Sequence, residues 1–478
     1  MRAEIVKQAA KRGVILDPEL TELCLCQEDP VRFIDDVISS AKGKFHVCLR
    51  DLPSDFHDTS EKTRVESVPQ PRAVAPVRRG DIRVIEGTDV TGDSTCEGKI
   101  EDFSRYFQNR FRTLRKLLER RRELAGAMPL ERAMKMDREV KVIGMVADVN
   151  NTKNGHRILM LEDDSGESKV FISKESPLID DFIVPDEVIG VVGKPTGKKE
   201  MLIANDIVHP DIPRDNRMSP NDSTSQIGFL CDVHVGSSTF LQRQWDDMIS
   251  WLKKESENVG LHYLVLPGDV VDGIGIFPGH LEELTIKSIY GQYERTAEML
   301  KDIPDHITVV LQPGNHDSVR PAEPQPALAD AFAKYFDSNI MMVGNPAYLD
   351  VEGRTVLSYH GRSMDDWISS VQSLSYEQPL KVMEEMLKRR HLAPIYGKRT
   401  PLAPEKRDYM VIDRIPDIFV TGHVHGAGSA EYRGVKMINA STWQSQTEFQ
   451  KMHNFNPDPA ILPLVHLGTG KVTMMDFN

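Results

Sequence analysis

Five short polar motifs, each placed directly after an apolar run, constrain the fold of this chain more than any other feature. The motifs are Asp232-Val233-His234, Gly268-Asp269, Gly314-Asn315-His316-Asp317, His360-Gly361 and Gly422-His423-Val424-His425. The runs before them, 227–230, 263–266, 307–311, 356–359 and 418–420, have the length and composition of buried strands. Polar loops and helical stretches alternate with these runs. Residues 226–478 are therefore predicted to form an α/β sandwich that carries the motifs in loops at strand ends.

The residue types in these motifs suit a hydrolytic site with two metal ions. Hydrolysis of a phosphodiester near neutral pH needs a strong nucleophile and neutralisation of developing charge, and two divalent metals about 3.5–4 Å apart supply both. A mixed set of Asp, His and Asn ligands favours manganese, iron or zinc over magnesium alone. A lone histidine or Gly-Asp pair is common in structural roles, but the full ordered set is specific. We interpret it as a metal site in which Asp269 bridges the two ions.

The first hundred residues have a different character. Residues 1–48 are predicted to be a small helical module, because Asp29-Pro30 has the form of a helix start and Val31, Ile34 and Ile38 share one helical face. A second short helix is expected after Asp17-Pro18. Residues 49–102 are rich in proline and charge with little periodicity, so we expect a flexible linker there.

Residues 103–212 are predicted to contain a basic helix followed by a small β-barrel. From Ser104 to Leu124 an apolar stripe recurs at helical spacing beside eight Lys or Arg. That basic face could touch phosphates or simply be solvated. Five short strand patterns follow, at 142–147, 157–161, 169–172, 188–192 and 201–207, and five short strands suit an OB-type barrel. No aromatic platform for base stacking is evident, so contact with nucleic acid stays open. Residues 213–225 read as another linker.

The order and spacing of the motifs resemble those of the calcineurin-like metallophosphoesterase superfamily. The resemblance implies two metal-ligand sets that share one carboxylate: Asp232, His234, Asp269 and His425, and Asp269, Asn315, His360 and His423. It also implies that His316 assists the transition state or protonates the leaving oxygen. Asp317 would then orient His316.

An OB-type barrel ahead of a phosphoesterase domain resembles the B-subunits of replicative polymerases, and in particular the small subunits of archaeal family D DNA polymerases. Residues 89–96, 319–326 and 391–397 also carry this resemblance. It implies a 3′–5′ proofreading exonuclease that acts on single-stranded or mismatched DNA 3′ ends. Its metal would be manganese first, with magnesium, iron or zinc as alternatives. It also implies a partner, a large subunit that carries DNA synthesis; contact with a sliding clamp stays open.

Two arginines near the motifs are candidates for binding substrate. Arg320 follows the Gly-Asn-His-Asp motif and Arg362 follows His360, and the forked donors of arginine suit a phosphate. The alternative for both is a salt bridge to Asp365 or Asp366.

Three aromatic residues raise a similar choice. Phe277 or Tyr396 could stack on an unpaired 3′ base, with core packing as the alternative, and Trp443 is predicted to be core.

Two other functions are compatible with the same motifs: a phosphatase of the same superfamily acting on phosphoproteins or small molecules, and a catalytically silent scaffold subunit. The net charge of −13 argues against a protein that coats DNA. No run approaches the roughly 20 apolar residues that span a bilayer, and the N-terminus lacks the apolar core of a signal peptide. Five irregularly spaced cysteines form no disulfide framework. We therefore expect a cytoplasmic protein that has no membrane partner.

Overall fold

The computed structural model describes residues 15–16, 32, 46–47, 81–198, 200–452 and 455–478. The chain divides into two compact units, Met1–Ala75 and Pro76–Asn478. In the first unit, strand β1 (Ile15–Leu16) pairs in parallel with strand β2 (His46–Val47). Apart from these strands and Arg32, which is helical, the module predicted for residues 1–48 lies outside the described residues. That module stays a prediction.

The predicted amphipathic helix is α4 (Ile100–Leu118). Its buried side includes Tyr106, Phe111, Leu114 and Leu118, which recur at helical spacing. The last three pack in one cluster with apolar side chains of the neighbouring barrel. The predicted apolar stripe is therefore confirmed as a packing surface, and most of the basic side chains lie on the remaining faces.

The predicted barrel is also confirmed as a closed, five-stranded structure. Its strands are β4 (Val140–Asn151), β5 (Arg157–Asp163), β6 (Gly166–Ile172), β7 (Val188–Pro195) and β8 (Met201–Val208). They close in the order β4-β5-β6-β8-β7, with β6 and β8 parallel and the other neighbours antiparallel. The inward side chains, among them Val142, Leu159, Val170, Val191 and Leu202, are fully buried. Helix α5 (Leu130–Ala133) packs against the same core, and short 3₁₀ turns span Arg122–Leu124 and Pro177–Asp180.

The flexible linker predicted for residues 49–102 is wrong for the residues after 80. Strand β3 (Ile82–Val84) pairs antiparallel with β13 (Ala347–Val351) at the edge of a sheet. Glu405 then anchors the next stretch, because it accepts hydrogen bonds from Ser94 Oγ at 2.6 Å and from the Thr95 N–H at 3.0 Å. Sequence pattern missed this segment because the strand has three residues and its partners lie far along the chain. Residues 49–80 lie outside the described residues.

Two six-stranded sheets form the core of residues 226–478. The first contains β9 (Gln226–Phe229), β10 (Leu261–Leu266), β11 (Thr308–Leu311), β12 (Met341–Met342), β18 (Ile461–His466) and β19 (Val472–Asp476). The second contains β3, β13, β14 (Arg354–Ser358), β15 (Ile418–Thr421), β16 (Ala427–Tyr432) and β17 (Val435–Ala440). Their orders are β12-β11-β10-β9-β18-β19 and β16-β17-β15-β14-β13-β3.

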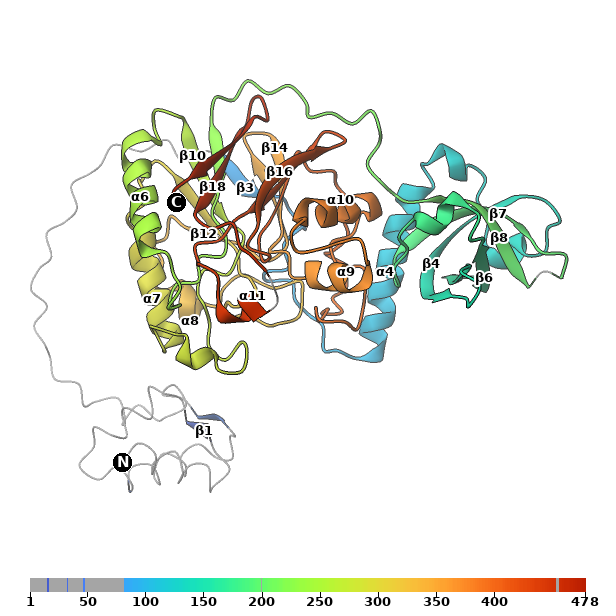
Figure 1. Ribbon diagram of the computed structural model, residues 1–478, viewed down its shortest axis with the longest axis horizontal. Coiled ribbons are helices and arrows are strands. Elements are labelled where there is room, and N and C mark those ends of the chain that lie inside the picture. The colour runs from blue at the N-terminus through green and yellow to red at the C-terminus, as the bar shows by residue number, and fades with distance from the viewer. Residues whose placement is uncertain (1–14, 17–31, 33–45, 48–80, 199, 453–454) are drawn as a thin grey trace, which may run out of the picture. The chain divides into compact units, whose positions relative to one another are not determined.

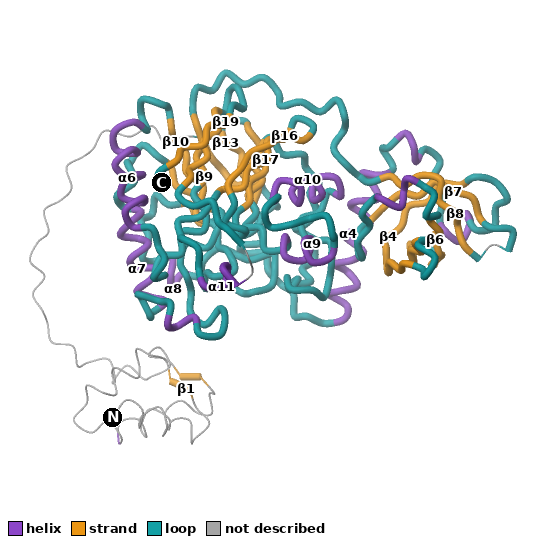
Figure 2. The backbone as a smooth tube through the Cα atoms, viewed as in Figure 1, coloured by secondary structure: helices purple, strands orange, loops and turns teal. Residues whose placement is uncertain are grey.

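Helices cover the outer face of each sheet (Figures 1 and 2). Beside the first sheet lie α6 (Gln242–Glu255), α7 (Ile289–Leu300) and α8 (Asp330–Ala333), and beside the second lie α9 (Met364–Ser370) and α10 (Pro379–Arg389). Two short helices, His280–Glu282 and α11 (Glu448–Met452), lie in loops. Side chains alternate along each strand, so Leu264 packs under the helices while Tyr263 and Val265 fill the space between the sheets. Phe419 and its neighbours Ile418 and Val420 repeat this pattern in the second sheet.

This topology positions the predicted site. Strands β9, β10 and β11 run parallel to one another, and so do β14 and β15. The carboxyl ends of parallel strands meet at one edge, which is where all five motifs begin. Residues 213–225, the second predicted linker, contain no helix or strand. Among the described helices, none is long and apolar enough to span a membrane.

Candidate two-metal site

One cluster of side chains joins the loops after β9 and β15. The Nε2 atoms of His234 and His425 lie 3.1 Å apart. Asp232 Oδ1 lies 3.8 Å from the first of these atoms and 3.4 Å from the second. Three atoms that can bind a metal therefore face one another, all within 4.8 Å.

A second cluster joins the loops after β10, β11, β14 and β15. Ligand atoms of Asp269, His360 and His423 lie within 4.8 Å of one another. His360 Nε2 is 3.3 Å from Asp269 Oδ2 and 3.0 Å from the amide oxygen of Asn315. The second predicted set is therefore also assembled.

Asp269 connects the two clusters. The same Oδ2 atom that faces His360 lies 4.0 Å from Nε2 of His234 in the first cluster. Asp269 thus occupies the shared position that a bridging carboxylate requires. The structure brings together every residue predicted as a ligand: Asp232, His234, Asp269, Asn315, His360, His423 and His425.

The backbone at this site is strained. Twelve non-glycine residues in the described parts of the chain have positive φ, and five of them are candidate ligands: Asp232, His234, Asp269, His423 and His425. Such conformations are uncommon outside glycine and concentrate at functional sites. Glycines make room for the side chains: a Cβ on Gly314 would lie 2.2 Å from Asp269 Oδ1, and one on Gly422 would lie 2.3 Å from Asp232 Oδ2.

Burial and charge act in opposite directions on these groups. Burial by itself raises the pKa of Asp232, but the nearby imidazoles of His234 and His425 hold that pKa well below its usual value. Burial likewise opposes ionisation of Asp269, yet the charge of His360 holds its pKa low. In return, and against burial, these carboxylates and Asp272 raise the pKa of His234 to about 10, and Asp269 raises that of His360 to about 9. The site therefore favours positive charge, which a divalent cation could supply in exchange for the histidine protons.

Two further observations show that these donors fit a cation. Asp232 Oδ1 is buried and receives no hydrogen bond from the described residues, and an unpaired buried carboxylate oxygen is costly. Nδ1 of His234 contacts a carboxylate oxygen of Asp272 at 2.9 Å. A carboxylate only accepts, so Nδ1 carries one proton, and once a cation replaces the second proton the Nε2 lone pair would face the cluster.

Each of three cluster histidines is held by a partner that sequence analysis did not assign to this role. Asp272 holds His234, as described above. Asp365 Oδ2 lies 3.3 Å from His423 Nε2, and Gln450 Nε2 lies 2.9 Å from His425 Nδ1. The spacing of Asp272, three residues after Asp269, was a weak signal. The other two partners come from α9 and α11, and their sequences carry no recognisable pattern.

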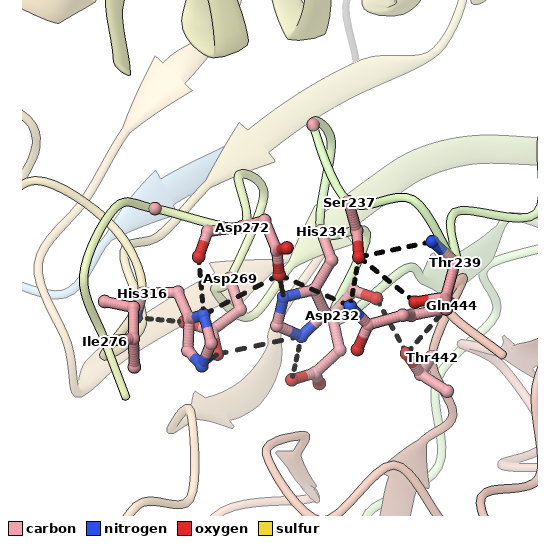
Figure 3. A network of polar contacts seen from close by, with 12 residues as sticks. Asp232, His234, Ser237, Thr239, Asp269, Asp272, Ile276, His316, Thr442 and Gln444 are labelled. Carbon is pink, nitrogen blue, oxygen red and sulfur yellow. Dashed lines mark hydrogen bonds and ion pairs between the residues drawn. The ribbon is translucent and has the colours of Figure 1, made fainter. Parts of the chain in front are cut away.

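His316 lies beside His234 and Asp269 (Figure 3). Its orienting partner differs from the prediction. Its Nε2 is 4.0 Å from Asp269 Oδ2, and its Nδ1 donates to the Asp272 carbonyl at 2.7 Å. The prediction that Asp317 orients His316 is therefore wrong. Asp317 accepts hydrogen bonds from the Gly314 N–H at 2.8 Å and the Tyr293 hydroxyl at 3.1 Å, so it shapes the loop. Burial lowers the pKa of His316 to about 4, whereas burial and the charge of Asp269 raise that of Asp317 to about 7.

The two arginines predicted to bind a substrate phosphate make other contacts in the structure. Arg320 forms a salt bridge with Glu405 at 2.8 Å and donates to the Pro324 carbonyl, so its guanidinium is engaged in structure. Arg362 donates to the Pro321 carbonyl at 3.0 Å and forms no ion pair with a described residue. The alternative salt bridge to Asp365 or Asp366 is thus wrong for both arginines, and neither of them lines the cavity described next.

A cavity of about 480 Å³ opens over the two clusters. Its lining includes His234, Asp269, His316, His423 and His425, and its one Lys or Arg among the described residues is Arg399, which no sequence pattern distinguished.

Aromatic side chains fall into three different settings. Phe277 lines the cavity. Tyr396 does not, and it packs edge-on against Phe103 and Phe107 of α4. Trp443 is fully buried in the core, as predicted.

The segment that contains most of this site defines a class of protein. Residues 227–427 match the family of DNA polymerase alpha/epsilon B-subunits. The chain is 41% identical to the DNA polymerase II small subunit of Archaeoglobus fulgidus over 99% of this chain and 98% of that one. It is 39% identical to the one from Methanothermobacter thermautotrophicus over 98% and 99%. The chain belongs to the family of archaeal DNA polymerase II small subunits. A solved archaeal phosphodiesterase aligns with 52% of this chain and 98% of its own at 11% identity and a TM-score of 0.27, too weak a likeness to argue from.

Proposed function

We propose that this small subunit is a metal-dependent 3′–5′ exonuclease that removes nucleotides from single-stranded or mismatched DNA ends. One observation carries the proposal: a complete set of Asp, His and Asn donors converges from five loops into two clusters that share Asp269. In this proposal, residues 226–478 are a calcineurin-like phosphoesterase domain and residues 103–212 contain an OB-type barrel. A larger subunit, which the relatives' name "small subunit" implies, would carry DNA synthesis.

The donors assign two cation positions. Asp232, His234, Asp269 and His425 would hold one ion, and Asp269, Asn315, His360 and His423 the other. Two divalent ions held at these positions would lower the pKa of water and would neutralise charge on a phosphodiester. Manganese suits the mixed oxygen and nitrogen donors, with iron, zinc or magnesium as alternatives.

A side chain of the protein supplies the proton that the leaving oxygen takes up. A water molecule that has lost one proton to solvent attacks phosphorus through its oxygen, the bond from phosphorus to the 3′ oxygen of the penultimate nucleotide breaks, and that oxygen takes a proton. His316 is the donor in this proposal. Its Nδ1 proton is engaged by the Asp272 carbonyl, so Nε2 is the atom that transfers a proton. The negative charge of a bound phosphate favours the protonated imidazole.

We assign the Arg399 guanidinium to the substrate phosphate next to the one that is cleaved. It lies in the cavity near Asp365 and Tyr376, and an arginine pairs with phosphate oxygens through two parallel donors. It replaces Arg320 and Arg362 in that role.

The test is degradation of single-stranded oligonucleotides labelled at the 5′ or the 3′ end, in manganese, with the Asp269→Ala protein as control. Stepwise shortening of the 5′-labelled strand, release of labelled mononucleotide from the 3′-labelled strand and an inactive variant are expected. An inactive wild type that a large subunit does not restore would refute the proposal and favour a scaffold. Faster cleavage of a phosphoserine peptide would favour a phosphatase.

A further inference from the structure

One part of the cavity lining is polar and the other is apolar. Beyond the histidines and carboxylates of the two clusters, the lining includes Ile276, Phe277, Ile368, Val424 and Phe455. A site for a phosphate alone needs no such surface. Apolar and aromatic side chains in a ligand cavity mark the place of an apolar or π-bearing group of the ligand.

The loop that carries Phe277 is built directly onto the catalytic side chains. It follows Asp272, and it passes so close to His316 that a Cβ on Gly273 would lie 2.6 Å from the His316 carbonyl oxygen. The N–H of Ile276 donates to Nδ1 of His280 at 3.2 Å. Nε2 of His280 lies 3.2 Å from Asp272 Oδ2, the carboxylate whose other oxygen holds His234.

Phe277 is itself positioned by this chain of contacts. Its ring lies on the His280 ring, with centroids 4.4 Å apart and planes 32° apart. Its place in the cavity is thus tied, through His280 and Asp272, to His234. Nearby on the same loop, Ile276 is 41% exposed, so part of this apolar surface faces the open cavity.

We infer that this surface is a subsite for the base of the terminal nucleotide and that Phe277 is the residue on which the base stacks. The inference rests on the proposed exonuclease function. A phosphate held at the clusters places its own nucleoside within the same 480 Å³ cavity, where these side chains lie. Stacking on an aromatic ring is tolerant of base identity, as removal of successive nucleotides requires. A base can occupy this subsite only after it leaves its partner strand, which costs least at a mismatched end. The subsite therefore selects frayed ends over paired ones.

The experiment compares two single-stranded oligonucleotides that differ only in the 3′-terminal residue, which is either an ordinary nucleotide or an abasic analogue. Wild-type full-length protein in manganese should cleave the abasic end with kcat/KM about 5- to 150-fold lower. Phe277→Ala should lower kcat/KM for the ordinary end to near the abasic value and leave the abasic end unchanged, and Phe277→Trp should preserve the discrimination. Leu281→Ala is the matched control, because Leu281 is 50% exposed on the same loop and does not line the cavity.

The other outcomes distinguish failure of the subsite from failure of the exonuclease function. Equal cleavage of the two ends by the wild type, or an equal loss on both ends in Phe277→Ala, overturns the subsite and leaves the exonuclease function standing. An abasic effect found only at the penultimate nucleotide overturns the assignment to the terminal base. If the wild type cleaves neither strand and a large subunit does not restore cleavage, the proposed function fails. The subsite is then judged by quenching of a terminal 2-aminopurine, which wild-type protein must produce and Phe277→Ala must abolish.

Discussion

Replacing Asp272 by asparagine should weaken the first metal cluster although Asp272 is not itself a predicted ligand. Its Oδ1 contacts His234 Nδ1 at 2.9 Å and Gln444 Nε2 at 3.3 Å, and its Oδ2 contacts His280 Nε2 at 3.2 Å. His280 Nδ1 accepts the Ile276 N–H, so in the neutral ring Nε2 must carry the proton that it donates to Asp272. Both carboxylate oxygens therefore act as acceptors.

Asparagine has one acceptor where aspartate has two. Whichever way the amide is oriented, its NH₂ group faces an N–H, either of His280 or of His234. That leaves buried donors unsatisfied and costs about 1–3 kcal/mol of folding free energy. Loss of a partner that orients a metal-binding histidine typically lowers metal affinity about 10- to 100-fold. We expect the manganese affinity of Asp272→Asn to fall by that factor.

The assay is calorimetric titration of metal-free protein with manganese, alongside the manganese dependence of oligonucleotide cleavage. Glu283→Gln is the matched control, since Glu283 lines the same cavity and no hydrogen bond or ion pair of its side chain with a cluster histidine is present among the described residues. A folded Asp272→Asn protein whose manganese affinity stays within about twofold of wild type would refute the reasoning about His234.

Three other predictions concern a buried ion pair, the metal clusters and the arginine of the cavity. Arg110→Met should lower the free energy of unfolding in urea by about 3 kcal/mol, because it removes the 2.7 Å ion pair of the buried Asp408. Asp408 then keeps its contacts with His391 and the Tyr106 hydroxyl, each at 2.9 Å. A loss below about 1 kcal/mol would show that the pair contributes little. Removal of metal with a chelator should lower the melting temperature measured by scanning calorimetry, and manganese should restore it in the wild type but not in Asp232→Asn. An identical response of both proteins would contradict metal binding at the cluster that contains Asp232. Arg399→Gln should reduce kcat/KM for oligonucleotides about tenfold at low salt, in keeping with the loss of one charge-assisted contact, whereas Arg362→Gln should change it little; the reverse order would return the phosphate contact to Arg362.

The barrel and the sandwich were predictable because their signals are local. Apolar runs such as 263–266 and 418–420 became β10 and β15, and the five strand patterns of 142–207 became the closed barrel. Strand β3 was missed because its stability comes from pairing with β13, a partner that no local pattern indicates.

The contacts of the arginine side chains were likewise not predictable from local sequence patterns. Arg320 and Arg362 are close to the motifs in sequence, yet contacts with Glu405 and Pro321 engage their guanidinium groups outside the cavity. Arg399 reaches the cavity from a loop that carries no motif.

Residue type and strand-length apolar runs are local properties, so they identify the residues that could bind metal and place them at strand ends. How those residues are held depends on tertiary packing. His316 is oriented by the Asp272 carbonyl and not by its neighbour Asp317, since neighbouring side chains on a turning loop point in different directions. Asp269 lies between the two clusters only because parallel strands from both sheets end at one edge. That edge exists only once the two sheets have packed against each other.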